Sequence, residues 1–120
     1  MGLLGRFRRR RGPETAAETD RLALAQLASR GADLTRPRHV VHVLAFADEA
    51  AARAAAAEVA RGGYETAVRP TGEGTAQWSV RAEAQRVVDA TTVPGFRAWF
   101  ERIAAAHGGR YEGWEAARKP

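Results

Sequence analysis

Hydrophobic and polar positions along the chain follow two different periods, and each change of period predicts a new element. Residues 38–46 are apolar on both faces of an extended chain, which predicts a strand in the centre of a sheet. Residues 64–70 and 76–84 alternate as half-buried strands do, and the TGEGT segment between them predicts a hairpin connection. Residues 110–115 are short enough for a final edge strand. The pattern therefore predicts four strands.

Three other segments carry apolar residues at the spacing of amphipathic helices. Thr15 and Glu18 have the S/T-x-x-E spacing of a capping box, and Gly31 can end the helix that they begin. Asp48 is a good N-cap for an alanine-rich helix, and Pro94 suits the first turn of the last helix. The expected helices cover residues 15–30, 49–61 and 93–107.

The order of elements is a helix followed by β-α-β-β-α-β, which predicts an α+β fold of the ferredoxin-like sandwich type with an additional N-terminal helix. We expect residues 1–13 to form a disordered basic tail and residues 14–118 to form one domain. The usual strand order 4-1-3-2, all antiparallel, makes strands one, three and four neighbours. It would gather His42, Trp78 and the stretch Tyr111–Trp114 toward one patch.

The formal net charge of +5 is concentrated at one end of the 120-residue chain. The first eleven residues hold five arginines and no acid, whereas the rest has 14 basic and 14 acidic residues. Such a tail can bind anionic lipid or nucleic acid weakly, but a solvated basic tail is the simpler interpretation. No apolar run approaches a membrane-spanning length, and cysteine is absent, which fits a cytoplasmic protein. The five arginines are Arg6, Arg8, Arg9, Arg10 and Arg11.

The amino-acid sequence shows no familiar catalytic motif or metal-binding motif. His39 and His42 are three apart on a strand, so they leave opposite faces and cannot share a metal ion. Ser29 and Ser79 do not lie in a nucleophile elbow, and the carboxylates are scattered. We therefore predict a protein that is not an enzyme and that holds neither a metal nor another cofactor.

Two residues within the strands stand out. His42 is polar within an apolar strand, and a neutral core histidine hydrogen-bonded by a neighbour is favoured over a reactive group. Trp78 is expected in the core from its alternation, with a contact platform as the alternative. RNA-recognition modules of this topology carry several aromatics on the third strand, where this chain has Trp78 alone, so sheet-face RNA binding is disfavoured.

The stretch Tyr111-Glu112-Gly113-Trp114 places two large aromatics around a glycine on the expected edge strand. In one interpretation Gly113 admits an aromatic side chain from the next strand, which makes a structural lock. In the other, Tyr111 or Trp114 faces outward and anchors a protein partner. The sequence leaves both interpretations open.

The PRHVVHVLAF stretch with His42, the later strand with Trp78 and the GGRYEGWE segment together resemble the regulator of ribonuclease activity B family, also called ribonuclease E inhibitors. The resemblance covers about residues 20–116. It implies a ferredoxin-like sandwich that acts by binding an endoribonuclease of the E/G class, without catalysis. His42, Tyr111, Gly113 and Trp114 correspond to positions that mark the family.

The sequence departs from the family in two ways. Position 112 is Glu where the family often has Asp, and some members end in a long acidic tail that this chain, ending at Pro120, does not show. Two alternatives to a ribonuclease-binding regulator follow from the residues. The arginine-rich tail could bind nucleic acid or an anionic membrane surface, or the open sheet face near His42 could form a small-molecule or catalytic pocket.

Overall fold

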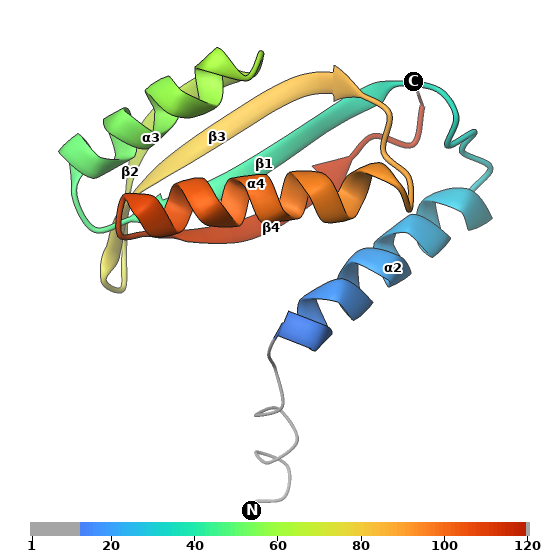
Figure 1. The fold of residues 1–120 in the computed structure, drawn as a ribbon, viewed down its shortest axis with the longest axis horizontal. Helices are drawn as coiled ribbons and strands as arrows, with labels where there is room; N and C mark the ends of the chain where they lie inside the picture. The colour runs from blue at the N-terminus through green and yellow to red at the C-terminus, as the bar shows by residue number, and fades with distance from the viewer. Residues whose placement is uncertain (1–12, 120) are drawn as a thin grey trace, which may run out of the picture.

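The computed structural model describes residues 13–119, and it gives residues 13–15 by their backbone alone. They form an α+β fold, as expected, in which three helices accompany a four-stranded antiparallel sheet (Figure 1). The predicted tail with its five arginines lies outside the described residues, except for Pro13. The elements in chain order are α2 (Pro13–Ser29), β1 (Arg38–Phe46), α3 (Glu49–Arg61), β2 (Glu65–Glu73), β3 (Ala76–Arg86), α4 (Thr92–Ala106) and β4 (Arg110–Ala116).

Two of the helices begin and end close to the predicted residues, and the third begins earlier. The side chain of Asp48 caps α3 by accepting a hydrogen bond from the backbone N–H of Ala51 at 2.8 Å. The first helix, α2, begins at Pro13, so Thr15 and Glu18 lie inside the helix and the expected capping box is wrong. Proline suits a first helical position because that position has no carbonyl partner for its N–H in any case.

Strand β1 lies inside the sheet, between β3 and β4. The strands lie in the order β2-β3-β1-β4, and every neighbouring pair is antiparallel. The apolar run of β1 predicts an inner strand, and β1 does pair with a neighbour along each of its edges. His42, at the middle of β1, lies opposite Ala82 of β3 and opposite Trp114 of β4.

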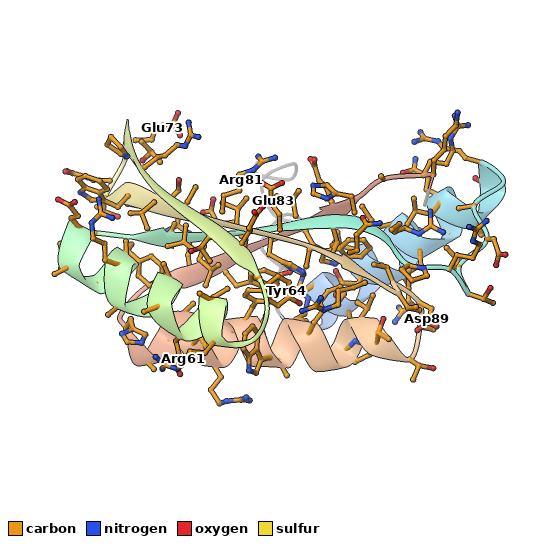
Figure 2. All side chains as sticks on the ribbon, turned by 90° about the horizontal axis from the view of Figure 1, so that it is seen from above. Arg61, Tyr64, Glu73, Arg81, Glu83 and Asp89 are labelled. Carbon is orange, nitrogen blue, oxygen red and sulfur yellow. The ribbon has the colours of Figure 1, made fainter. Side chains whose placement is uncertain are left out.

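The three helices lie on one side of the sheet and leave the other face open. α3 and α4 form the main core with the sheet, and the alanines of α3 let this helix approach closely. α2 lies on the same side, because its Leu24 packs against Val40 and Val93. The opposite face carries Arg81 and Glu83, which are paired at 2.8 Å and point away from the helices in Figure 2. Within residues 13–119 no helix covers that face.

The hairpin between β2 and β3 is tighter than the sequence pattern predicts. β2 continues to Glu73, so the segment expected as a five-residue connection contributes three residues to the strand. The pairing shifts register between Pro70 and Glu73, where proline lacks the N–H that a regular ladder needs. The hydroxyl of Thr71 donates to the carbonyl of Ala76 at 2.8 Å and holds the irregular end together.

The buried guanidinium of Arg38 joins the two segments that flank the sheet. Its Nη2 donates to the carbonyl of Asp33 at 2.6 Å, in the loop before β1. Its Nη1 donates to the carbonyls of Ala117, at 2.9 Å, and Arg118, both after β4. Arg38 is fully buried, so these carbonyl dipoles replace the water that would otherwise solvate its charge.

A β-bulge in β4 determines the direction of both of its aromatic side chains. Tyr111 lies opposite Leu44, and Trp114 lies opposite His42, so three steps along β4 match two steps along β1. The extra residue turns Tyr111 and Trp114 to the same face, although residues three apart on a regular strand face opposite ways.

Gly113 makes this bulge possible through its backbone. Its φ is +115°, in the region that favours glycine, and a Cβ added there would meet no atom within 4 Å. The interpretation that Gly113 makes room for an aromatic side chain is therefore wrong. The residue is needed for its conformation and not for space.

We expect Gly113→Ala to lower the free energy of unfolding by about 1–2 kcal/mol, because an L-residue is strained at this φ. Urea unfolding followed by tryptophan fluorescence measures the change. The control is Gly95→Ala in α4, where added atoms meet no neighbour and helix propensity favours alanine by about 0.5–1 kcal/mol. An unchanged midpoint for Gly113→Ala would contradict the role given to the bulge.

Candidate functional site

The imidazole of His42 is the centre of an aromatic cluster between the sheet and α4. It is fully buried, and its Nδ1 is hydrogen-bonded to the hydroxyl of Tyr111 at 2.7 Å. The ring of Phe100 stacks on it with the centroids 4.1 Å apart. Tyr64 and Phe96 stand almost perpendicular to it, at 5.5 and 4.7 Å. Four rings, Tyr64 just before β2 and three from α4 and β4, therefore enclose one polar side chain of β1.

This environment keeps His42 uncharged at neutral pH. Burial, together with the positive charges of Arg86 and Arg97, lowers the pKa of His42 from 6.5 to about 3. Its Nε2 has no hydrogen-bond partner, and the perpendicular aromatic rings occupy the space around the imidazole. Burial also raises the pKa of Tyr111. Neither group can exchange protons near neutral pH, so the pair acts as a neutral hydrogen bond within the core.

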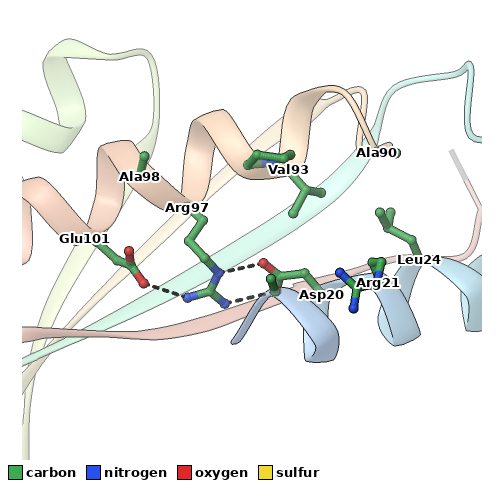
Figure 3. Close-up of a pocket in the computed structure, with 10 residues that line it drawn as sticks. Asp20, Arg21, Leu24, Ala90, Val93, Arg97, Ala98 and Glu101 are labelled. Carbon is green, nitrogen blue, oxygen red and sulfur yellow. Dashed lines mark hydrogen bonds and ion pairs between the residues drawn. The ribbon is translucent and has the colours of Figure 1, made fainter. Parts of the chain in front are cut away.

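A buried carboxylate, Asp20, joins α2 to α4 and β4. Asp20 accepts hydrogen bonds from Nε and Nη2 of Arg97 at 2.6 and 3.0 Å, and from Nε1 of Trp114 at 2.9 Å. Figure 3 shows the two bonds to Arg97 and a further ion pair from Arg97 to Glu101. Because Asp20 is only 6% exposed, the charge and donors of its partners compensate for the water that it loses.

Arg97 also connects the carboxylate to the histidine. Its guanidinium lies over the ring of Tyr111, 5.0 Å from the centroid, while the hydroxyl of Tyr111 is bonded to His42. Hydrogen bonds from Arg97 to Asp20 raise the pKa of Arg97, so it is charged at every relevant pH. We call the five residues His42, Tyr111, Arg97, Asp20 and Trp114 the His42–Asp20 network. It spans β1, β4, α4 and α2.

The structure brings most of the predicted site residues together, but not all of them. Tyr111 and Trp114 are half-buried and face the helices, so they are not outward anchors. Trp78 lies opposite Phe46 at the C-terminal end of β1, whereas His42 lies at the middle of the strand, and Trp78 packs on the main core. The expected single patch therefore lacks Trp78.

Sequence reasoning missed Asp20 and Arg97, which lie 77 positions apart. Both look like surface charges on amphipathic helices. Their spacing from apolar residues could have indicated burial. Asp20 lies one helical turn before Leu24 and Arg97 lies one turn before Phe100, and both apolar residues are buried.

The surface above the network contains a groove between α2 and α4 of about 430 Å³. Leu24, Val93 and Pro94 give it an apolar lining, and the Asp20–Arg97 pair lies in its wall (Figure 3). Among residues 13–119, no three His, Asp or Glu side chains are grouped so that they could hold a metal ion. No helix in that range is long and apolar enough to cross a membrane.

Comparison with known proteins gives one family. The family model described as "Regulator of ribonuclease activity B" matches residues 17–116, which includes every strand and nearly all of the helices. No curated protein matches the chain significantly.

We expect the depressed pKa of His42 to make stability depend on pH. Below pH 6.5 the unfolded chain binds a proton at this side chain, but the folded protein does not until about pH 3. The free energy of unfolding is therefore highest above pH 6.5 and falls on acidification by at most about 1.4 kcal/mol per pH unit from this group. Urea unfolding of the wild type and His42→Gln between these limits measures the difference in slope.

Tyr111→Phe is the matched control for the pH experiment. It removes the hydroxyl that bonds to His42 and is expected to lower stability by about 0.5–1.5 kcal/mol at each pH, with the slope retained. Equal slopes for the wild type and His42→Gln would show that the imidazole is not held neutral.

Asp20→Asn is expected to destabilise the protein by about 3 kcal/mol, because it leaves the half-buried guanidinium of Arg97 without its main counter-ion. Glu101→Gln removes the exposed second partner of the same arginine and should cost less than about 1 kcal/mol. Thermal unfolding measured by circular dichroism compares the two variants. Equal effects would mean that the buried pair does not attach α2.

Proposed function

The chain belongs to the regulator of ribonuclease activity B family, and we propose that it binds an endoribonuclease of the E/G class and alters RNA decay without catalysing a reaction. The match over residues 17–116 carries this proposal, because it includes the whole sheet together with most of α2. The family description supports regulation of ribonuclease activity. The identity of the enzyme and the location in the cytoplasm belong to the proposal.

The chemistry of the core supports binding over catalysis. His42 is neutral and enclosed by rings, and the carboxylate of Asp20 is fully engaged with Arg97 and Trp114. A general base needs access to substrate and a pKa near the working pH, and His42 has neither. The polar groups of the network hold elements together, which is what a binding scaffold requires.

In this proposal, the positions that mark the family stabilise the arrangement of the strands and helices and do not contact the partner. The hydrogen bonds of His42, Tyr111 and Trp114 orient β4 and α2 against α4, and these three side chains face the helices. Gly113 contributes through its backbone, which forms the bulge in β4. Substituting them would change binding by changing the fold, and direct contacts with the enzyme would come from other residues.

We also assign the fold to the ferredoxin-like type as part of this proposal. The strand order, the antiparallel pairing and the position of α3 and α4 on one face support that assignment. α2 is then an addition on the same side, attached through Asp20 and Leu24.

We expect the full chain to bind the purified E/G-class endoribonuclease of its own organism with a dissociation constant of about 1 μM or lower in moderate salt, that is, a binding free energy of about −8 kcal/mol. Isothermal titration calorimetry measures it, and cleavage of a structured transcript reports the effect on activity. Absence of binding at micromolar concentrations contradicts the proposal.

Removal of residues 1–12 is the control for the alternative function of the basic tail. The proposal expects the truncated protein to bind the enzyme within about twofold of the full chain, because the matched region starts at residue 17. If binding were lost on truncation and fell steeply with salt, the tail would be the binding element and would recognise a polyanion.

A further inference from the structure

A second surface hollow, separate from the α2–α4 groove, lies where the end of α3, the start of β2 and the first half of α4 meet. Its volume is about 420 Å³. Three half-buried aromatic side chains form its walls, and a single charged side chain lies at its edge. Figure 2 shows Tyr64 in the layer between the sheet and α4. We call it the aromatic hollow, and its residues are Gly62, Tyr64, Arg86, Gly95, Phe96 and Trp99.

The walls of the aromatic hollow are fixed by packing. Tyr64 stacks on Trp99 with the ring centroids 5.8 Å apart and meets Phe100 edge-on at 5.2 Å. A Cβ added at Gly62 would lie 2.6 Å from the ring of Trp99, so a glycine is needed for this ring to close on the end of α3. Phe96 contacts the ring of His42, which ties the hollow to the His42–Asp20 network. The hollow is therefore preformed.

Arg86 is the charged residue that lines the hollow, and two further arginines lie close to its lining residues in the chain. Arg86 lies over the ring of Tyr64, 4.6 Å from its centroid, and its Nη2 donates to the carbonyl of Gly62 at 3.1 Å. Arg61 immediately precedes Gly62, and Arg102 follows Trp99 by one helical turn on the same face of α4.

Within residues 13–119, none of these three arginines has a carboxylate within ion-pair distance. The carboxylates near these arginines in the sequence bind other partners or lie on the other face of the sheet. Glu58 pairs with His107, and Glu101 pairs with Arg97. Asp89 accepts from the backbone N–H groups at the start of α4. Glu65 lies opposite Glu83, on the open face of the sheet.

We propose that the aromatic hollow docks a short acidic segment of the partner protein. An aromatic or large aliphatic side chain of that segment enters the hollow, and carboxylates on either side of it pair with Arg61, Arg86 and Arg102. An apolar anchor in a preformed pocket with charges at its rim is the usual arrangement of a binding hot spot. The partner is the ribonuclease, so this inference rests on the proposed function.

The packing of the rings favours a protein segment over RNA. Single-stranded RNA binds by stacking its bases on exposed aromatic faces. Here Tyr64 faces Arg86 and Trp99, and Phe96 contacts His42 and Trp114 edge-on. These contacts already occupy ring surface that a base would need for stacking, so a side chain fits this open hollow better than a stack of bases.

A peptide titration tests the hollow without the enzyme. The probe is a five-residue peptide with phenylalanine at its centre and two acidic residues on each side, and the protein is the full chain. The three tryptophans give separate indole N–H signals by NMR. We expect the signal of Trp99 to shift most, with smaller changes at Trp114 and none at Trp78. The same peptide with lysines in place of the acids should cause no shift.

Filling the hollow provides a variant that keeps the fold. A Cβ at Gly95 meets nothing within 4 Å, and its φ is not in the positive range, so Gly95→Gln adds a side chain where the ligand would lie. We expect it to weaken binding of both the peptide and the ribonuclease by about tenfold or more. Ala98→Gln places the same side chain on the neighbouring α2–α4 groove and should leave both affinities unchanged.

Charge reversal at the rim is the second test. Arg102→Glu should weaken binding by about tenfold, because it replaces attraction to the acidic segment by repulsion. The matched control is Arg69→Glu on β2, an exposed arginine outside the hollow whose reversal should change affinity by less than about twofold.

The outcomes separate this inference from the proposed function. If the ribonuclease binds the wild type and Gly95→Gln equally, and the acidic peptide leaves Trp99 unshifted, the inference is overturned while the function stands. If the peptide binds at Trp99 but the ribonuclease does not bind, the site is supported and the assigned enzyme is wrong. A shift of Trp99 with a short oligouridylate and not with the acidic peptide also overturns the inference.

Discussion

The bulge at Gly113 is the constraint on which the internal organisation of this protein depends. It turns Tyr111 and Trp114 to one face of the sheet, so that the first bonds to His42 and the second to Asp20. With regular pairing, one of these two side chains would face the open side and one of the two hydrogen bonds would be lost. A single left-handed residue thus holds both halves of the network together, and with them the positions of β4, α4 and α2.

In our proposal, the positions that mark the family are distinct from the residues that contact a partner. The marking side chains are directed inward, where substitution is costly because polar groups would be left buried without partners. The surfaces available for binding consist of exposed side chains whose positions the fold determines. Examples are Arg61 at the end of α3 and Arg102 within α4.

Much of the fold could be predicted because its signals are local. The apolar run of β1 and the Asp48 cap of α3 identify their elements without any knowledge of tertiary contacts. The site could be predicted only in part. Two-residue periodicity places Tyr111 and Trp114 on opposite faces, and only the pairing of β4 with β1 reveals the extra residue. The Asp20–Arg97 pair joins helices that are far apart in sequence, and nothing local distinguishes it from surface charge.

The attachment of α2 has a consequence for the dynamics of the chain. This helix reaches the rest of the molecule through Asp20 and the apolar side chains of Leu24 and Leu27, with far less backbone proximity than any other element. Its amide protons should therefore exchange with solvent through local opening, well before those of β1, which exchange only when the whole sheet comes apart. α2 is thus the part of the protein that can be displaced at the lowest cost while the sheet stays intact.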